Sequence, residues 1–170
     1  MNGKNLINNL PNSCWFWSSV YIIEKYVENN GVPKELSNNI IKQLIETKNF
    51  NIEKYDEETM KQSDITNNLD GNAVEFLTVN GFYYTSCIPV RRLKDSFAEL
   101  QINGELPFAF LIQLPGHYAS VILKDNDYYL YDRVGSMLNK VKLNFDKEKL
   151  VVKIPINPLY SNIYIFAKEI

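Results

Sequence analysis

The chain has 170 residues, of which 45% are hydrophobic and 22% are charged, and its formal net charge is -2. This length and composition are typical of one globular domain with a hydrophobic core, and they exclude a fibrous or disordered protein. The 18 basic and 20 acidic residues are mixed along the chain, so no basic face is expected. A general nucleic-acid binder is therefore excluded.

No segment approaches the roughly 18 apolar residues that a membrane span requires, and residues 1–13 lack the apolar stretch of a secretory signal. The two cysteines, Cys14 and Cys87, lie far apart, and His117 is the single histidine. Neither a disulfide framework nor a zinc site is expected from this set, and no cofactor is predicted. A reducing, cytosolic compartment is the simplest setting, which for a viral or bacterial effector protein means the host cytosol.

The first half of the chain is predicted to be helical. A first helix is expected to begin near Cys14 and to end at Asn29-Asn30-Gly31, because one apolar face with helical spacing is formed by Phe16, Val20, Ile23 and Val27. A second amphipathic helix is predicted between Pro33 and Lys48, and a short one over residues 73–79. Another helix is suggested by the spacing of Leu93, Phe97 and Leu100.

The second half is predicted to form strands. Turn signals at Pro115-Gly116 and at Asp125-Asn126-Asp127 separate three apolar stretches, and two more apolar stretches follow nearer the C-terminus. The five predicted strands cover residues 106–114, 117–123, 128–132, 150–156 and 164–170. Helices followed by antiparallel strands make an α+β fold. The chain is predicted to be one domain over 1–170, with a helical half to about 104 and a β half over about 105–170.

Cys14 and Cys87 are predicted to have different roles. A thiol reacts as the thiolate, which a helix N-terminus and a neighbouring imidazolium both stabilise. Cys14 is expected at such an N-terminus, which makes it a candidate nucleophile beside the alternative of a buried structural thiol. Cys87, flanked by apolar residues, is expected to be the buried structural thiol.

His117 is the candidate base, because no other imidazole exists in the chain. Asp132 ends the next predicted strand, 132 − 117 = 15 residues later, and a hairpin of that length returns the chain beside its start. Asp132 could then accept a hydrogen bond from one ring nitrogen while the other faces the thiol.

An acyl-transfer site also needs donors for the oxyanion that forms on the attacked carbonyl. The backbone N–H of Cys14 would supply one, and a side-chain amide just upstream another. Asn8, Asn9 and Asn12 are all available for this role, and each is also a plausible cap or turn residue.

Two stretches resemble the papain-like cysteine peptidases. Asn9-Leu10-Pro11-Asn12-Ser13-Cys14-Trp15 is similar to the cysteine box of ubiquitin-specific proteases, N-L-G-N-T-C-[FYW], with Pro11 in place of the glycine. Gly116-His117-Tyr118-Ala119, followed by Tyr128-Tyr129-Leu130-Tyr131-Asp132, is similar to their histidine box. Picornaviral leader proteases and nidoviral papain-like proteases share these themes. The separation 117 − 14 = 103 leaves no room for a finger subdomain and suits the compact viral or josephin-like enzymes.

The resemblance implies a papain-like fold with Cys14 as nucleophile, His117 as base and Asp132 as the group that orients the histidine. It assigns the oxyanion role to Asn9, with Asn8 as the alternative, and makes Trp15 and Tyr118 neighbours that shape the substrate pocket. The implied partner is a protein substrate: ubiquitin, a ubiquitin-like modifier or a viral-type polyprotein. The same triad also serves glutamine deamidases, transglutaminases and peptidoglycan amidases, and an inactive modifier-binding descendant is a further alternative.

Overall fold

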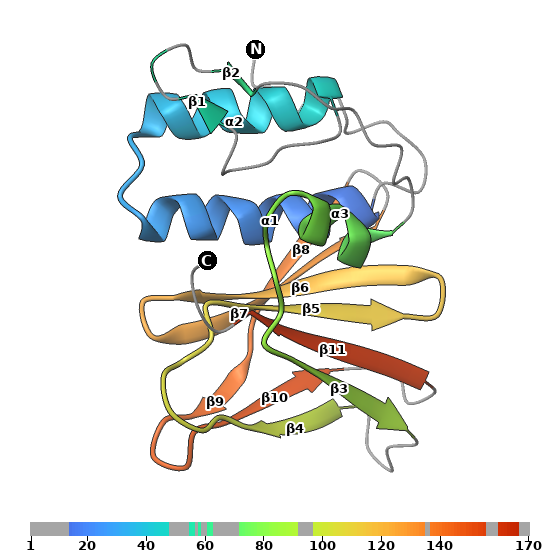
Figure 1. Ribbon diagram of the computed structural model, residues 1–170. Helices are drawn as coiled ribbons and strands as arrows, with labels where there is room; N and C mark the ends of the chain where they lie inside the picture. Colours follow the sequence, from blue (N-terminus) through green and yellow to red (C-terminus); the bar gives the residue numbers. More distant parts are fainter. Residues whose placement is uncertain are drawn as a thin grey trace.

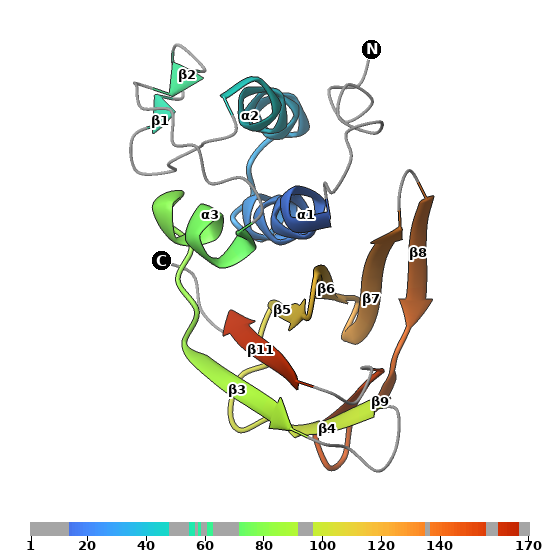
Figure 2. The same ribbon diagram turned by 90° about the vertical axis from the view of Figure 1, so that its right-hand side faces the viewer.

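The protein is built in three layers, with helices above a six-stranded sheet and a smaller sheet below it (Figures 1 and 2). The structure, a computed structural model, describes residues 14–47, 55–56, 58, 61–62, 72–91, 97–134, 137–155 and 160–166. Helix α1 lies between helix α2 and the larger sheet, and the short helix α3 lies beside α1 (Figure 2). The predicted α+β class, with N-terminal helices packed on a C-terminal antiparallel sheet, is confirmed.

The three helices lie where the apolar spacing predicts them, at α1 (Cys14–Asn29), α2 (Lys34–Thr47) and α3 (Ala73–Val79). Helix α1 ends where Gly31 adopts a φ of 68°, a left-handed conformation that glycine adopts without steric cost. Helix α3 is capped at its start by Asn72, whose side chain accepts a hydrogen bond from the Glu75 N–H at 3.1 Å. Because α1 is covered on both sides, almost its whole circumference is buried.

The six-stranded sheet is antiparallel and carries the strand order β3-β11-β5-β6-β7-β8. Its strands are β3 (Ser86–Arg91), β5 (Ala109–Leu114), β6 (His117–Lys124), β7 (Asp127–Val134), β8 (Met137–Lys142) and β11 (Tyr160–Phe166). Neighbouring residues of β6 enter different cores: Tyr118 and Ile122 face the helices, whereas Ala119 and Val121 face the smaller sheet. Burial on both faces explains why this part of the sequence is apolar throughout rather than alternating.

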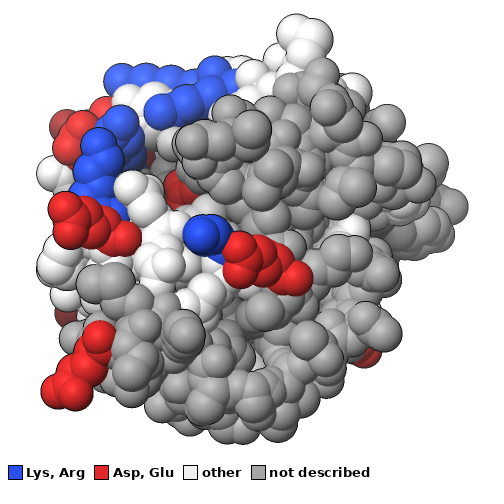
Figure 3. All heavy atoms as spheres, turned by 90° about the horizontal axis from the view of Figure 1, so that it is seen from above, with Lys and Arg blue, Asp and Glu red and all other residues white. Residues whose placement is uncertain are grey.

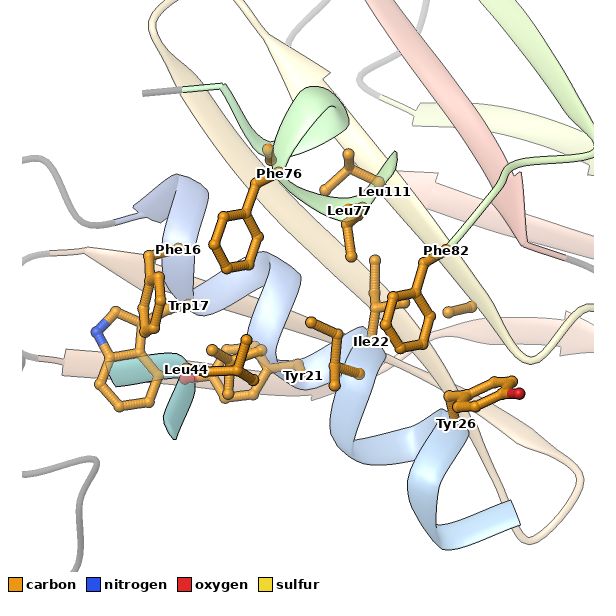
Figure 4. Packing of buried hydrophobic residues seen from close by; sticks show 14 of the residues in the cluster. Phe16, Trp17, Tyr21, Ile22, Tyr26, Leu44, Phe76, Leu77, Phe82 and Leu111 are labelled. Carbon is orange, nitrogen blue, oxygen red and sulfur yellow. The ribbon is translucent and has the colours of Figure 1, made fainter. Parts of the chain in front are cut away.

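The upper core joins the helices to the sheet through tightly packed aromatic rings. Figure 4 shows Phe16, Trp17 and Tyr21 of α1 in one cluster with Phe76 of α3. Phe16 and Phe76 meet edge to face, with ring centroids 5.6 Å apart. This packing fixes α1, and with it Cys14, against the sheet.

The smaller sheet covers the other face of the large one and has the strand order β4-β10-β9. It consists of β4 (Phe97–Gln101), β9 (Asn144–Asp146) and β10 (Val151–Pro155). Two further short strands, β1 (Tyr55–Asp56) and β2 (Lys61–Gln62), pair with each other between α2 and α3 in the chain. Strands β1, β2, β3, β8 and β9 were not among those that the sequence predicts.

The helix suggested by Leu93, Phe97 and Leu100 is wrong, because residues 97–101 form β4 and pair with β10. Ala98, Leu100 and Ile102 are buried while Glu99 and Gln101 are exposed, which is the period of a strand. The transition from helices to strands therefore comes at β3, before the boundary near residue 104 that the sequence suggests.

Charges of both signs lie side by side on the described part of the upper face (Figure 3). Two ion pairs on the helices are Lys25 with Glu28 at 3.8 Å, in which the lysine is mostly buried, and the exposed pair of Lys42 with Glu46 at 3.9 Å. Among the helices described, none combines the length and the apolar character that crossing a membrane requires.

Candidate active site

Cys14 is the first residue of α1 and is partly exposed, at the end of the helix where backbone N–H groups are unpaired. Interactions with the backbone of Tyr118 and of Trp15 lower the pKa of its thiol. The predicted helix start at Cys14 is confirmed. The positive end of the helix and these N–H groups both favour a negative charge on the sulfur.

His117 is held at the start of β6 by a tight hairpin. Leu114 and His117 close the β5–β6 pair across the two-residue turn Pro115-Gly116, and Gly116 has a φ of 69°. A side chain at Gly116 would be strained by this backbone conformation, so glycine is needed here. The hairpin fixes the backbone of His117 to the centre of the sheet.

Asp132 comes beside His117 through the next hairpin. The β6–β7 turn consists of Asp125 and Asn126, whose φ angles of 52° and 63° are those of a type I′ turn. The β6–β7 ladder ends with Ser120 opposite Tyr131, so Asp132 is the first residue of β7 beyond this pairing, close to the start of β6.

The three candidate residues form one connected chain of contacts. His117 Nε2 and Asp132 Oδ1 are 2.6 Å apart, with 29% and 32% of the two side chains exposed. The imidazole also interacts with the Cys14 thiol, and this interaction is the largest cause of the raised pKa of His117. Because Nε2 is bound to Asp132, Nδ1 is the nitrogen left for the sulfur.

The pKa values of the thiol and the imidazole are shifted in opposite directions. The hydrogen bond with His117 lowers the pKa of Cys14 most, the backbone hydrogen bonds from Tyr118 and Trp15 add to this, and partial burial opposes it. The hydrogen bond with Cys14 and then that with Asp132 raise the pKa of His117 to about 9, again against burial. Both shifts favour a thiolate–imidazolium pair over two neutral groups at neutral pH.

The side chains of Trp15 and Tyr118 are buried next to the site. Trp15 packs edge to face on Phe76, with centroids 5.5 Å apart, as part of the upper core. The Tyr118 hydroxyl accepts a hydrogen bond from Gln113 Nε2 at 3.1 Å. Their predicted role in shaping a substrate pocket stays a prediction.

Gln113 is a neighbour of the site that the sequence did not single out. Its Oε1 accepts hydrogen bonds from Asn162 Nδ2 and from the Tyr164 hydroxyl, each at 3.1 Å. With Tyr118 these residues link β6, β5 and β11, which stiffens the sheet behind His117. A polar residue in an otherwise apolar central strand was the signal available in the sequence.

The expectation that Cys87 is a buried structural thiol is wrong, because Cys87 is exposed. It lies on β3, which is an edge strand of the six-stranded sheet, opposite Tyr164 of β11. The apolar neighbours in the sequence suggested burial, but an edge strand leaves such a position open to water.

The candidate oxyanion residues Asn9, Asn8 and Asn12 lie outside the described residues, so the predicted oxyanion role stays a prediction. Within the part of the chain that the structure describes, no three histidine, cysteine, aspartate or glutamate side chains gather in a way that could hold a metal ion.

No protein-family model, no curated protein and no solved structure matches this chain. The geometry of Cys14, His117 and Asp132 is therefore the main evidence for a function.

Proposed function

We propose that the protein is a cysteine peptidase in which Cys14 is the nucleophile, His117 the general acid and base, and Asp132 the residue that orients His117. The observation that carries this proposal is the contact chain from the thiol at a helix N-terminus, through the imidazole, to a carboxylate 2.6 Å away. A thiol beside an imidazole that a third group orients is the arrangement that activates a nucleophilic cysteine, whereas a purely structural cysteine has no need of it.

The chemistry follows from the ion pair. The Cys14 thiolate attacks the carbonyl carbon of the substrate, and the His117 imidazolium gives its proton to the departing nitrogen as the C–N bond breaks. A thioester of Cys14 results. His117, now neutral, takes a proton from water, whose oxygen attacks the thioester and releases a carboxylic acid and the free thiol.

Asp132 and the helix start support these steps in different ways. Asp132 holds the Nε2–H of His117, so that Nδ1 faces the sulfur and the leaving group in turn. The backbone N–H of Cys14 would donate to the oxyanion, and we propose that a side-chain amide from Asn9 donates beside it.

For the substrate we propose the C-terminus of ubiquitin or of a ubiquitin-like modifier. The support is the resemblance of Asn9–Trp15 and Gly116–Ala119 to the two boxes of ubiquitin-specific proteases. A free nucleophilic thiol also suits the reducing cytosol, where such modifiers act. A viral-type polyprotein or a glutamine side chain would present the same carbonyl chemistry.

A panel of three probes tests the proposal. A ubiquitin carrying a C-terminal electrophile, a general thiol electrophile and a series of peptide substrates would be applied to the wild type and to Cys14→Ala. Labelling of Cys14 by the ubiquitin probe, together with cleavage of peptides, is the expected result. Labelling only by the general electrophile, without peptide cleavage, would reject the peptidase and leave deamidation or transfer.

Replacing Asn9 with alanine is expected to lower kcat by about 10²–10³-fold, the usual scale for losing one oxyanion donor. KM should change little, because the hydrogen bond forms in the transition state rather than with the bound substrate. Asn8→Ala and Asn12→Ala are the matched controls and should cost less in kcat. A larger loss in Asn8→Ala would move the role to that residue.

A further inference from the structure

A buried cluster of side chains joins α1 to β7 close to the candidate site. Arg133 is only 8% exposed, although its guanidinium is always charged. Its Cζ lies 4.2 Å from the centroid of the Trp17 ring, and its Nη1 donates to the Tyr21 hydroxyl at 3.3 Å. The Tyr21 ring in turn packs on Tyr131, with centroids 5.0 Å apart. We call Arg133, Trp17, Tyr21 and Tyr131 the arginine clamp.

The clamp binds together the two elements that carry the nucleophile and the orienting carboxylate. Trp17 and Tyr21 follow Cys14 by three and seven residues on α1, so the three residues share one side of the helix (Figure 4 shows the two rings). Arg133 directly follows Asp132 on β7. A side chain that fixes Arg133 against α1 therefore also fixes the backbone that carries Asp132.

We propose that Arg133 is a positioning residue, which sets the position of Asp132, and through it of His117, relative to Cys14 by holding β7 on α1. The contacts form a closed loop: Cys14 is joined through α1 to the clamp, through β7 to Asp132, and through His117 back to the sulfur. If β7 moved along α1, the contact between Asp132 and His117 or the one between His117 and Cys14 would therefore lengthen.

The chemistry of arginine supports a role in geometry rather than in packing alone. An apolar side chain could fill the same space without removing a charge from water. A planar guanidinium stacked on an indole and bonded to a hydroxyl fixes direction as well as distance. The sequence uses lysine for 15 of its 18 basic residues, and arginine at Arg91, Arg92 and Arg133 only.

The charged groups that the structure shows at the clamp differ from those that it shows at the imidazole. Glu24 and Tyr131 act electrostatically on Tyr21, and the ammonium of Lys140 on β8 lies 5.2 Å from the centroid of the Tyr131 ring. His117 is influenced by Cys14 of α1 and Asp132 of β7. We therefore expect Arg133 to affect the ion pair through the position of Asp132 rather than through its own charge.

The test measures the thiolate of Cys14 directly, in a Cys87→Ser background that leaves one thiol. The rate of alkylation by iodoacetamide would be followed against pH in the wild type, Arg133→Met, Arg133→Lys and Tyr21→Phe. A loosened Asp132 stabilises the imidazolium less, so the pKa of Cys14 should rise. In Arg133→Met we expect the acidic limb of the alkylation profile to move to higher pH, so that alkylation on the rising part of that limb slows by about tenfold. Arg133→Lys should fall between Arg133→Met and the wild type.

Tyr128→Phe is the matched control. It removes a buried hydrogen bond, from the Tyr128 hydroxyl to the Pro107 carbonyl at 2.8 Å, in the lower core and away from α1. It should lower stability without moving the pH dependence of alkylation. An unchanged profile in Arg133→Met, or an equal shift in Tyr128→Phe, would overturn the proposal. If Arg133→Met does not fold, Tyr21→Phe decides, and an unchanged profile there rejects the clamp.

This inference rests on the candidate site but not on turnover. Alkylation reports the thiolate whether or not a peptide bond is ever cleaved. A shifted alkylation profile together with failed peptide cleavage would therefore reject the peptidase and retain the clamp. Peptide cleavage by the wild type, together with an unshifted alkylation profile in Arg133→Met, would reject the clamp and retain the peptidase.

Discussion

Replacing Cys14 with alanine is expected to abolish turnover while the fold stays intact. Without the thiol no covalent intermediate can form, and the ion pair with His117 is lost. Cys14 is only partly buried, so its truncation leaves little cavity, and the free energy of unfolding should change by no more than about 1 kcal/mol. Turnover of a cleaved substrate and chemical denaturation measure the two effects separately.

Cys87→Ala is the control for this substitution, because it also removes a free thiol. It lies on the edge strand β3 and should leave kcat and KM unchanged. Retained turnover in Cys14→Ala together with lost turnover in Cys87→Ala would refute the assignment of the nucleophile.

Substitutions of His117 and Asp132 are expected to lower the rate in a graded order. His117→Ala should lose nearly all activity, because no second imidazole exists to take its place. Asp132→Ala should lose less, and Asp132→Asn less again, because an amide oxygen still accepts the Nε2–H bond. The rate constants of the three variants under saturating substrate test this order. An Asp132→Ala variant equal to the wild type would leave Asp132 as a strand residue without a part in catalysis.

The same series should change the dependence of the rate on pH. The active ion pair is lost at low pH when the Cys14 thiolate takes a proton, and at high pH when His117 loses one, at about 9. Asp132→Asn removes a negative charge that stabilises the imidazolium, so the pKa of His117 falls and the basic limb moves to lower pH. The chain has a single histidine, so its imidazole signals in an NMR titration need no assignment. The hydrogen bond that the imidazolium donates to the Cys14 sulfur is the largest cause of the raised pKa, so Cys14→Ala should lower the pKa of His117 further than Asp132→Asn does.

The elements that position the site were predictable because their signals are local. Helix α1 shows one apolar face over its length, and the β5–β6–β7 hairpins are marked by Pro115-Gly116 and by Asp125-Asn126. Strand β4 was misread because Leu93, Phe97 and Leu100 happen to fit a helix, whereas pairing with β10 makes residues 97–101 a strand. Strand β8 was missed because all of its residues are exposed, so burial imposes no pattern on the sequence.

Residues whose environment depends on distant parts of the chain were the ones that the sequence did not reveal. Arg133 looks like a surface residue after a strand-end aspartate, but Trp17 and Tyr21, the latter 112 residues earlier in the chain, enclose it. Cys87 was misjudged for the complementary reason, since only the strand order shows that β3 lies at an edge. The local sequence shows which residues can react. Whether a residue is buried, and which groups surround its charge, depends on how the helices and the two sheets pack together.

The order of the chain has a consequence for protein synthesis. Cys14 leaves the ribosome first, and His117 follows only after another 117 − 14 = 103 residues, with Asp132 later still. Until β6 and β7 have paired and docked on α1, no imidazole makes the thiol more acidic, and the nascent chain carries an ordinary cysteine. A ribosome-bound chain stopped before β6 should therefore resist the electrophiles that label the finished protein, so the timing of β-hairpin assembly sets the moment at which reactivity begins.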